Sequence, residues 1–182
     1  MTKTFFKYVI PSMLAFALSG IYAIVDGFFV GNSVGDQGLA TINLVYPLVA
    51  LIQAAGTGIG MAGAIHFAIA EGGNRMNERN RYFWITCGLL VLVSVVLTLV
   101  YLPLGRTLLR LLGAQGALES YGREYITVIT MGILFQVLGV GLVPVIRNMG
   151  KSIQAMAAMI AGFLTNILLD YVFVWVLPYG LA

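Results

Sequence analysis

Five long apolar runs, separated by short polar segments, dominate the chain. They cover about residues 8–30, 41–70, 82–102, 125–146 and 152–177. Each is long enough for a helix to cross a bilayer, which takes roughly 20 residues. Lipid offers the backbone no hydrogen-bond partners, so such runs predict helices rather than open strands. We predict an all-α membrane protein with five transmembrane helices.

The segments between the runs have distinct characters. Residues 31–38 are rich in glycine and polar residues and predict a turn-rich loop. In the segment of about 104–113, leucines alternate with Arg106 and Arg110, which predicts an amphipathic interfacial stretch. Pro47 lies inside the second run and predicts a kink there.

Composition narrows the function class. The chain is 60% hydrophobic and 9% charged, whereas soluble domains carry about 25% charged residues. The net charge of +3 comes from loop residues, so it indicates no nucleic-acid surface. The single Cys87 excludes a disulfide framework. No catalytic triad, metal-ligand spacing or P-loop appears, so we expect neither an enzyme nor an organic cofactor.

The loop charges predict an orientation. The amino-terminal segment, the second loop and the fourth loop carry seven basic residues: Lys3, Lys7, Arg75, Arg79, Arg81, Arg147 and Lys151. The opposite side carries three: Arg106, Arg110 and Arg123. The positive-inside rule then places the amino terminus in the cytoplasm and Ala182 outside. The first run lacks a signal-peptide cleavage site and is read as a retained helix.

The second run contains a glycine motif, Gly58-Ile-Gly60-Met-Ala-Gly63. It matches G-x-G-x-x-G, but no strand precedes it, so a nucleotide-binding role is disfavoured. Gly56 and Gly60 also form G-x-x-x-G, which lets membrane helices approach closely. We therefore predict a helix-packing face here.

Two acids lie inside the apolar runs, Asp26 in the first and Asp170 in the fifth. A carboxylate in hydrocarbon costs roughly 3 kcal/mol on insertion scales. Both helices run outward, and both acids lie roughly 6–10 Å below the outer boundary at 1.5 Å per residue. Asn166 lies one turn before Asp170 on the same face. The sequence does not show whether the two helices are neighbours.

A built polar site would have defined chemistry. On the first helix, Ser19 and Tyr22 share the face of Asp26, and Gln53 and Gln136 are further polar residues within spans. Two nearby carboxyl groups titrate as a coupled unit, which suits proton transfer. Carboxylate and amide oxygens also suit a hard cation such as Na⁺. In the simpler alternative, each acid reaches the outer interface alone, although an aspartate side chain is short for that.

Several motifs, in order, resemble the multidrug and toxic compound extrusion (MATE) family. They are Ile24-Val-Asp26-Gly27-Phe-Phe-Val-Gly31, Ala40-Thr-Ile-Asn43-Leu-Val-Tyr46-Pro47, Arg147-Asn-Met-Gly150-Lys and Asn166-Ile-Leu-Leu-Asp170. The prokaryotic branch that contains the DNA-damage-inducible proteins is the most similar. The resemblance implies a twelve-helix exporter of two six-helix lobes in the inner membrane. It also implies exchange of Na⁺ or H⁺ for amphipathic, often cationic drugs, with Asp26, Asn166 and Asp170 as the ion site and Tyr22 beside it.

The chain departs from this pattern in length. Residues 1–182 would form an incomplete amino-terminal lobe that lacks the sixth helix and the carboxy-terminal lobe, so we expect no transport by this chain alone. It would be a truncated or partial product, or else a complete half that dimerises. Two other functions stay open: a lipid-linked oligosaccharide flippase of the same superfamily, and a non-transporting membrane fragment that packs with a partner.

Overall fold

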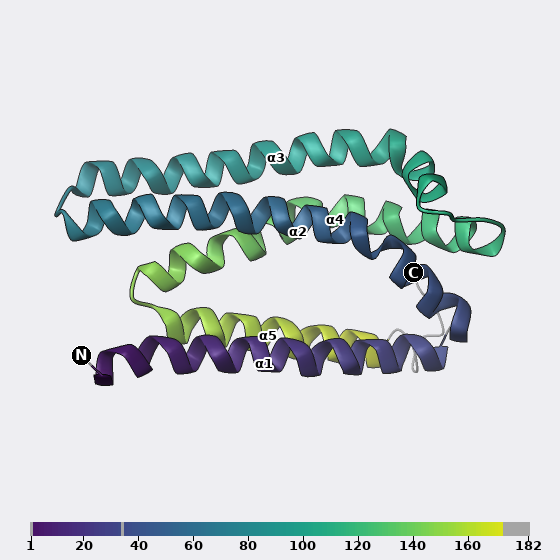
Figure 1. The fold of residues 1–182 in the computed structure, drawn as a ribbon, viewed down its shortest axis with the longest axis horizontal. Helices are drawn as coiled ribbons and strands as arrows, with labels where there is room; N and C mark the ends of the chain where they lie inside the picture. The colour runs from purple at the N-terminus through teal and green to yellow at the C-terminus, as the bar shows by residue number, and fades with distance from the viewer. Residues whose placement is uncertain (1, 34, 173–182) are drawn as a thin grey trace.

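The computed structural model describes residues 2–33 and 35–172, and the regular structure in these ranges is helical (Figure 1). The helices are α1 (Thr2–Ser33), α2 (Gly35–Gly72), α3 (Met76–Leu111), α4 (Ala117–Asn148) and α5 (Ser152–Tyr171). Each contains a stretch long and apolar enough to cross a membrane. The predicted all-α architecture with five long apolar helices is confirmed.

Some boundaries differ from the sequence prediction. The loop expected at 31–38 is mostly helical, since α1 extends to Ser33 and α2 begins at Gly35. Gly35 has a φ of +70°, a conformation that glycine adopts at little cost, so the chain can reverse there without a longer loop. Within the predicted interfacial segment 104–113, residues up to Leu111 form the last turns of α3. Residues 173–177 of the fifth run lie outside the described residues.

Consecutive helices run in opposite directions (Figure 1). The start of α1, the α2–α3 turn and the α4–α5 turn therefore lie at one end of the molecule. These are the segments that carry the seven basic residues. At the other end, Glu119 of α4 pairs with Arg106 and Arg110 of α3 at 2.7 and 2.9 Å.

A three-helix bundle of α2, α3 and α4 contains the main core. Its fully buried side chains come from all three helices and include Ile52, Leu90, Ile133 and Val137. Buried hydroxyls on the same faces donate to carbonyls of their own helices: Ser94 to Leu90 at 2.6 Å and Thr130 to Ile126 at 2.6 Å. These internal hydrogen bonds let polar residues face neighbouring helices without an unsatisfied donor.

Glycines set the spacing within this bundle. A Cβ on Gly60 would overlap the backbone of Gly141 in α4, and one on Gly63 would overlap the Thr86 side chain in α3. A Cβ on Gly56 would lie 2.7 Å from Val140 Cγ2. A Cβ on Gly58, on the other side of α2, would have no atom of another described element within 4 Å. The predicted packing role of Gly56, Gly60 and Gly63 is therefore confirmed.

The helices α1 and α5 form a pair beside the bundle (Figure 1). Arg147, at the end of α4, connects the pair to the bundle, and its neighbour Asn148 joins α4 to α2 within the bundle. The guanidinium of Arg147 lies 5.4 Å from the ring centroid of Phe16 in α1, and its Nη2 lies 3.5 Å from Met159 Sδ in α5. The Asn148 amide donates to the Ala64 carbonyl of α2 at 2.8 Å.

Candidate functional site

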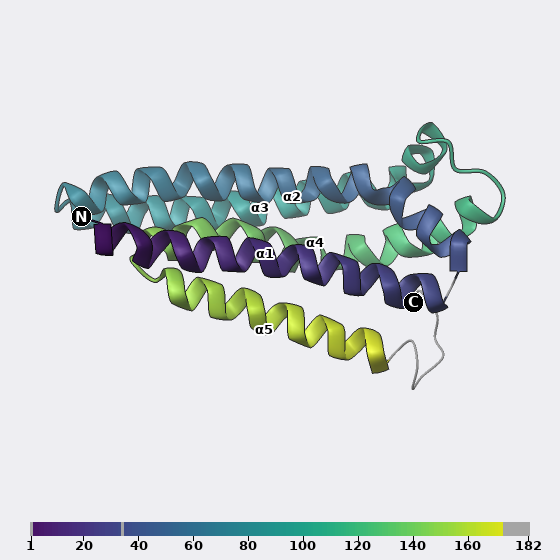
Figure 2. The ribbon, with the colours of Figure 1, turned by 60° about the horizontal axis from the view of Figure 1, so that its bottom comes forward.

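The two intramembrane acids lie on neighbouring parallel helices. Asp26 belongs to α1 and Asp170 to α5, and both views show these helices side by side (Figures 1 and 2). The carboxyl groups are close enough to interact electrostatically. Neither side chain is exposed, since both are half-buried. The structure thus shows that the two helices are neighbours, which the sequence had left open.

Tyr22 joins the acids from α1. Its ring stacks on Phe163 of α5, with a centroid distance of 5.2 Å and an interplanar angle of 11°. Its hydroxyl interacts electrostatically with both Asp26 and Asp170. The stacked rings therefore join α1 to α5 beside the carboxyl groups.

Asn166 and Asp170 each have a buried oxygen that receives no hydrogen bond within the described part of the chain. These atoms are Asn166 Oδ1 and Asp170 Oδ2, and neither has a hydrogen-bond partner among the described residues. Both atoms are acceptors, because a carboxylate and an amide oxygen accept and do not donate. A proton on the carboxyl group, or a cation between the oxygens, would supply the missing positive partner. Leaving such acceptors buried and unsatisfied costs about 1–3 kcal/mol each.

Tyr125 of α4 is a further member of this group. It is half-buried and interacts electrostatically with Asp26 and with Tyr22. The sequence places it at the start of an apolar run, where an aromatic residue is typical of the interfacial belt. This position at the end of a predicted span was the only sequence signal for Tyr125, and the packed structure is what brings it close to Asp26.

In the ranges it describes, the structure does not connect the other predicted site-lining residues to the acids. Ser19 donates its hydroxyl to the Phe16 carbonyl at 2.7 Å, so its donor is used within α1. Gln53 is exposed on α2, and Gln136 is half-buried on α4. None of the described interactions joins these three residues to the acids. Within the described residues, no group of three His, Cys, Asp or Glu side chains could hold a metal ion.

Comparisons with known proteins agree on one family. The sequence profile of the MatE family matches residues 11–172. The multidrug export protein MepA of Staphylococcus saprophyticus is 26% identical over 175 residues, which are 95% of this chain and 38% of that protein. MepA of Staphylococcus aureus strain NCTC 8325 is 25% identical over the same length and coverage.

Solved structures give the same result. An outward-facing multidrug resistance MATE family transporter of the MOP superfamily superposes with a TM-score of 0.92 at 27% identity. A MOP superfamily transporter from Pyrococcus furiosus gives the same TM-score and identity. The match to the first covers 98% of this chain and 40% of the solved one. The chain thus spans about two-fifths of its relatives and corresponds to most of one lobe, as expected.

Proposed function

Because the chain belongs to the MatE family, we propose that it is the amino-terminal part of an ion-coupled multidrug efflux antiporter. The relatives it resembles are multidrug export proteins, and their remaining length would provide the sixth helix and the second lobe. The substrates would be amphipathic, often cationic compounds. The protein would lie in a prokaryotic inner membrane with its amino terminus in the cytoplasm, because seven basic residues lie at that end.

The observation that carries ion coupling is the pair of unsatisfied acceptors beside a second carboxylate. Asn166 Oδ1 and Asp170 Oδ2 have no donor among residues 2–33 and 35–172, and Asp26 interacts with Asp170 across the α1–α5 contact. Two ionised carboxylates in a low-dielectric site repel each other. A proton or Na⁺ at Asp26, Asn166 and Asp170 would remove that repulsion and satisfy both acceptors.

This chemistry suggests how ion binding becomes movement. The ion would draw α1 and α5 together where Tyr22 stacks on Phe163, and its loss would let the helices separate. Since α1 supplies none of the described buried side chains of the main core, it can shift while that core of α2, α3 and α4 keeps its packing. In the complete transporter, this shift would change the cavity between the lobes and release the drug. The 182 residues alone would bind the ion but not export.

Thermal unfolding of the purified chain in detergent tests the ion site. NaCl would be compared with choline chloride at constant ionic strength, and each would be repeated across a pH series. A ligand at ten times its Kd stabilises by about 1.4 kcal/mol. We expect the increase in unfolding temperature with Na⁺, or the change in unfolding temperature with pH, to be lost in Asp170→Asn and Asn166→Ala. Asp36→Asn and Asn43→Ala, which change the same residue types at exposed positions of α2, should keep it.

These two responses identify the ion. If only the site variants lose the stabilisation by Na⁺, the coupling ion is Na⁺. If only those variants lose the dependence of the unfolding temperature on pH, the coupling ion is H⁺. If wild type and site variants respond alike to both series, the proposed coupling site is wrong. If the site is correct, Asp26→Asn and Asp170→Asn in the complete transporter should reduce drug export and remove its ion dependence.

A further inference from the structure

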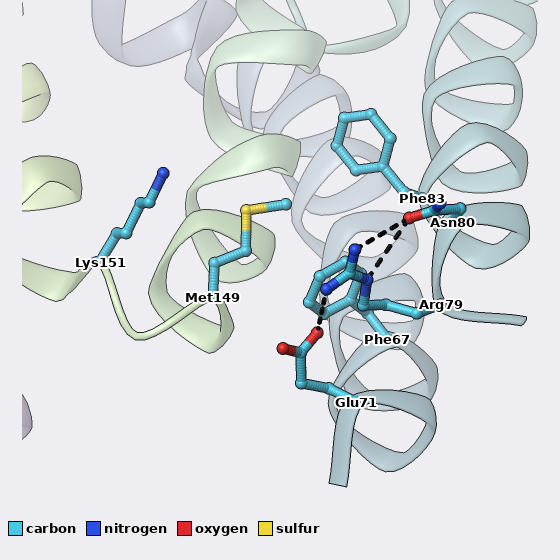
Figure 3. A pocket seen from close by; sticks show the side chains of 7 residues that line it. All are labelled: Phe67, Glu71, Arg79, Asn80, Phe83, Met149 and Lys151. Atoms are coloured by element: carbon cyan, nitrogen blue, oxygen red, sulfur yellow. Dashed lines mark hydrogen bonds and ion pairs between the residues drawn. The ribbon is translucent and has the colours of Figure 1, made fainter. Parts of the chain in front are cut away.

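Figure 3 shows a cavity of about 310 Å³. It lies beside the α2–α3 and α4–α5 turns, at the end of the molecule opposite the acids (Figure 1). It is lined by the last turns of α2, the first turns of α3 and the α4–α5 turn, and it is open on one side. Phe67, Phe83 and Met149 give it apolar walls, and Arg79 and Lys151 give it two cations. None of these residues belongs to the proposed ion site.

Arg79 is held in a fixed position at the cavity. Its Nη1 donates to Glu71 Oε2 at 3.0 Å, and its Nε and Nη2 donate to Asn80 Oδ1 at 3.4 and 3.2 Å. The guanidinium carbon lies 5.8 Å from the centroid of the Phe67 ring. A guanidinium has five N–H donors, so donors remain for a ligand without reorganising the side chain.

Lys151 gives the cavity its excess charge. Figure 3 shows its side chain on the opposite side of the cavity from Arg79. Glu71 balances Arg79, whereas Lys151 has no ion pair among the described residues. The cavity therefore carries one uncompensated positive charge. The amino terminus of α5, which begins at Ser152, adds partial positive charge on the same side.

The neighbouring surface marks the level of lipid headgroups. Trp84 packs edge-on against Phe83, with a centroid distance of 5.4 Å and an interplanar angle of 74°, and is 71% exposed. Tryptophan is enriched where lipid headgroups meet hydrocarbon. The cavity thus lies beside a lipid-facing surface, at the end that also carries Arg75, Arg81 and Arg147. A soluble anion would gain nothing from the apolar walls.

We propose that this cavity binds the headgroup of an anionic phospholipid. The phosphate would lie between Lys151 and Arg79, with the glycerol carbons against Phe83 and Met149. Basic pockets between membrane helices on the cytoplasmic side take such headgroups. The volume lies at the lower end of the range for drug-sized ligands, which suits a headgroup whose acyl chains remain outside. The proposal requires neither ion coupling nor export.

Native mass spectrometry of the detergent-solubilised chain tests this site. Phosphatidylglycerol and phosphatidylcholine with identical acyl chains would be titrated against wild type, Lys151→Gln and Lys151→Arg. We expect wild type to prefer phosphatidylglycerol, and Lys151→Gln to bind it about fivefold more weakly, as expected for one basic residue near an anionic lipid. Lys151→Arg should retain binding. Arg81→Gln, an equal charge loss outside the cavity, should stay within twofold of wild type.

A second arm adds inorganic phosphate at millimolar concentration. A lipid site keeps its phosphatidylglycerol under these conditions, whereas displacement of the lipid would assign the cavity to a soluble phosphate and overturn the proposal. Equal binding of both lipids, or equal losses in Lys151→Gln and Arg81→Gln, would also overturn it. Lys151 is exposed, so its substitution should leave the fold intact, and unfolding temperature checks this.

Discussion

Buried polar side chains of the bundle show how individual residues are satisfied inside an apolar protein. Tyr101 of α3 is buried and donates its hydroxyl to the Leu48 carbonyl of α2 at 2.9 Å. Hydroxyls such as Thr86 bond within their own helix, here to the Tyr82 carbonyl at 2.7 Å. Against this background, the unsatisfied oxygens of Asn166 and Asp170 are exceptional, and we interpret them as functional rather than structural.

Tyr101→Phe tests the strength of the hydrogen bond between α3 and α2. The substitution removes the hydroxyl and keeps the ring, so only this bond to Leu48 is lost. Hydrogen bonds between membrane helices average about 0.6 kcal/mol, and we expect the free energy of unfolding to fall by about that amount. Tyr46→Phe, at a 63% exposed position on α2, should change it less. Unfolding by a denaturing detergent measures both, and equal effects would contradict the assignment.

At the scale of elements, glycine spacing decides how closely α2 and α4 pack. Gly60 and Gly141 meet backbone to backbone, and Gly56 lies against Val137 and Val140. Dispersion contacts between closely packed helices are the main attraction available in lipid, because lipid tails are as apolar as the side chains. The glycines therefore stabilise the bundle by permitting contact rather than by burying side chains.

Gly60→Ala should destabilise the bundle, whereas Gly58→Ala should not. A Cβ at 60 overlaps the Gly141 backbone, and overpacking of this kind costs about 1–3 kcal/mol. A Cβ at 58 meets nothing within 4 Å, and the higher helix propensity of alanine favours that variant. Unfolding free energies of the two variants, measured side by side, check the prediction. A neutral Gly60→Ala would show that α2 and α4 are less tightly packed than described.

At the scale of the whole molecule, the structure consists of a bundle and a pair. The bundle of α2, α3 and α4 holds most of the buried apolar side chains, and the α1–α5 pair carries the candidate ion site. Arg147 contacts both helices of the pair from the end of α4. Arg147 thus connects the pair to the bundle at the basic end of the molecule. The acids lie toward the other end, where Tyr125 of α4 is the bundle residue beside them.

Arg147→Gln should loosen the pair without disturbing the bundle. It removes the cation–π contact with Phe16, which is worth roughly 0.5–2 kcal/mol. We expect faster amide hydrogen exchange in α1 and α5 and unchanged exchange in α2, α3 and α4. Arg81→Gln makes the same charge change at an exposed position and should leave exchange in the pair unchanged. A uniform increase across all five helices would show a global destabilisation instead.

Much of this organisation follows from the chain alone. The apolar runs dictate five helices, because the bilayer requires internally bonded backbone. Helix rise and loop charge predict that Asp26 and Asp170 lie at matching depth, and the spacing of Asn166 predicts that it shares the face of Asp170. The close-approach role of the glycines was likewise predicted. By contrast, the turn at Gly35 is shorter than predicted, because one positive φ replaced a longer loop.

The hydropathy pattern of the sequence did not show which helices lie next to one another. Tyr125 begins an apolar run, where an aromatic residue is typical of the interfacial belt, yet it lies near Asp26. The cavity between Arg79 and Lys151 joins segments about seventy residues apart in sequence. Periodicity and hydropathy fix a residue's depth and the face of its own helix. They leave open which helix that face meets, because surfaces that contact lipid and surfaces that contact protein are similarly apolar. Only the packed structure decides which polar residues come together.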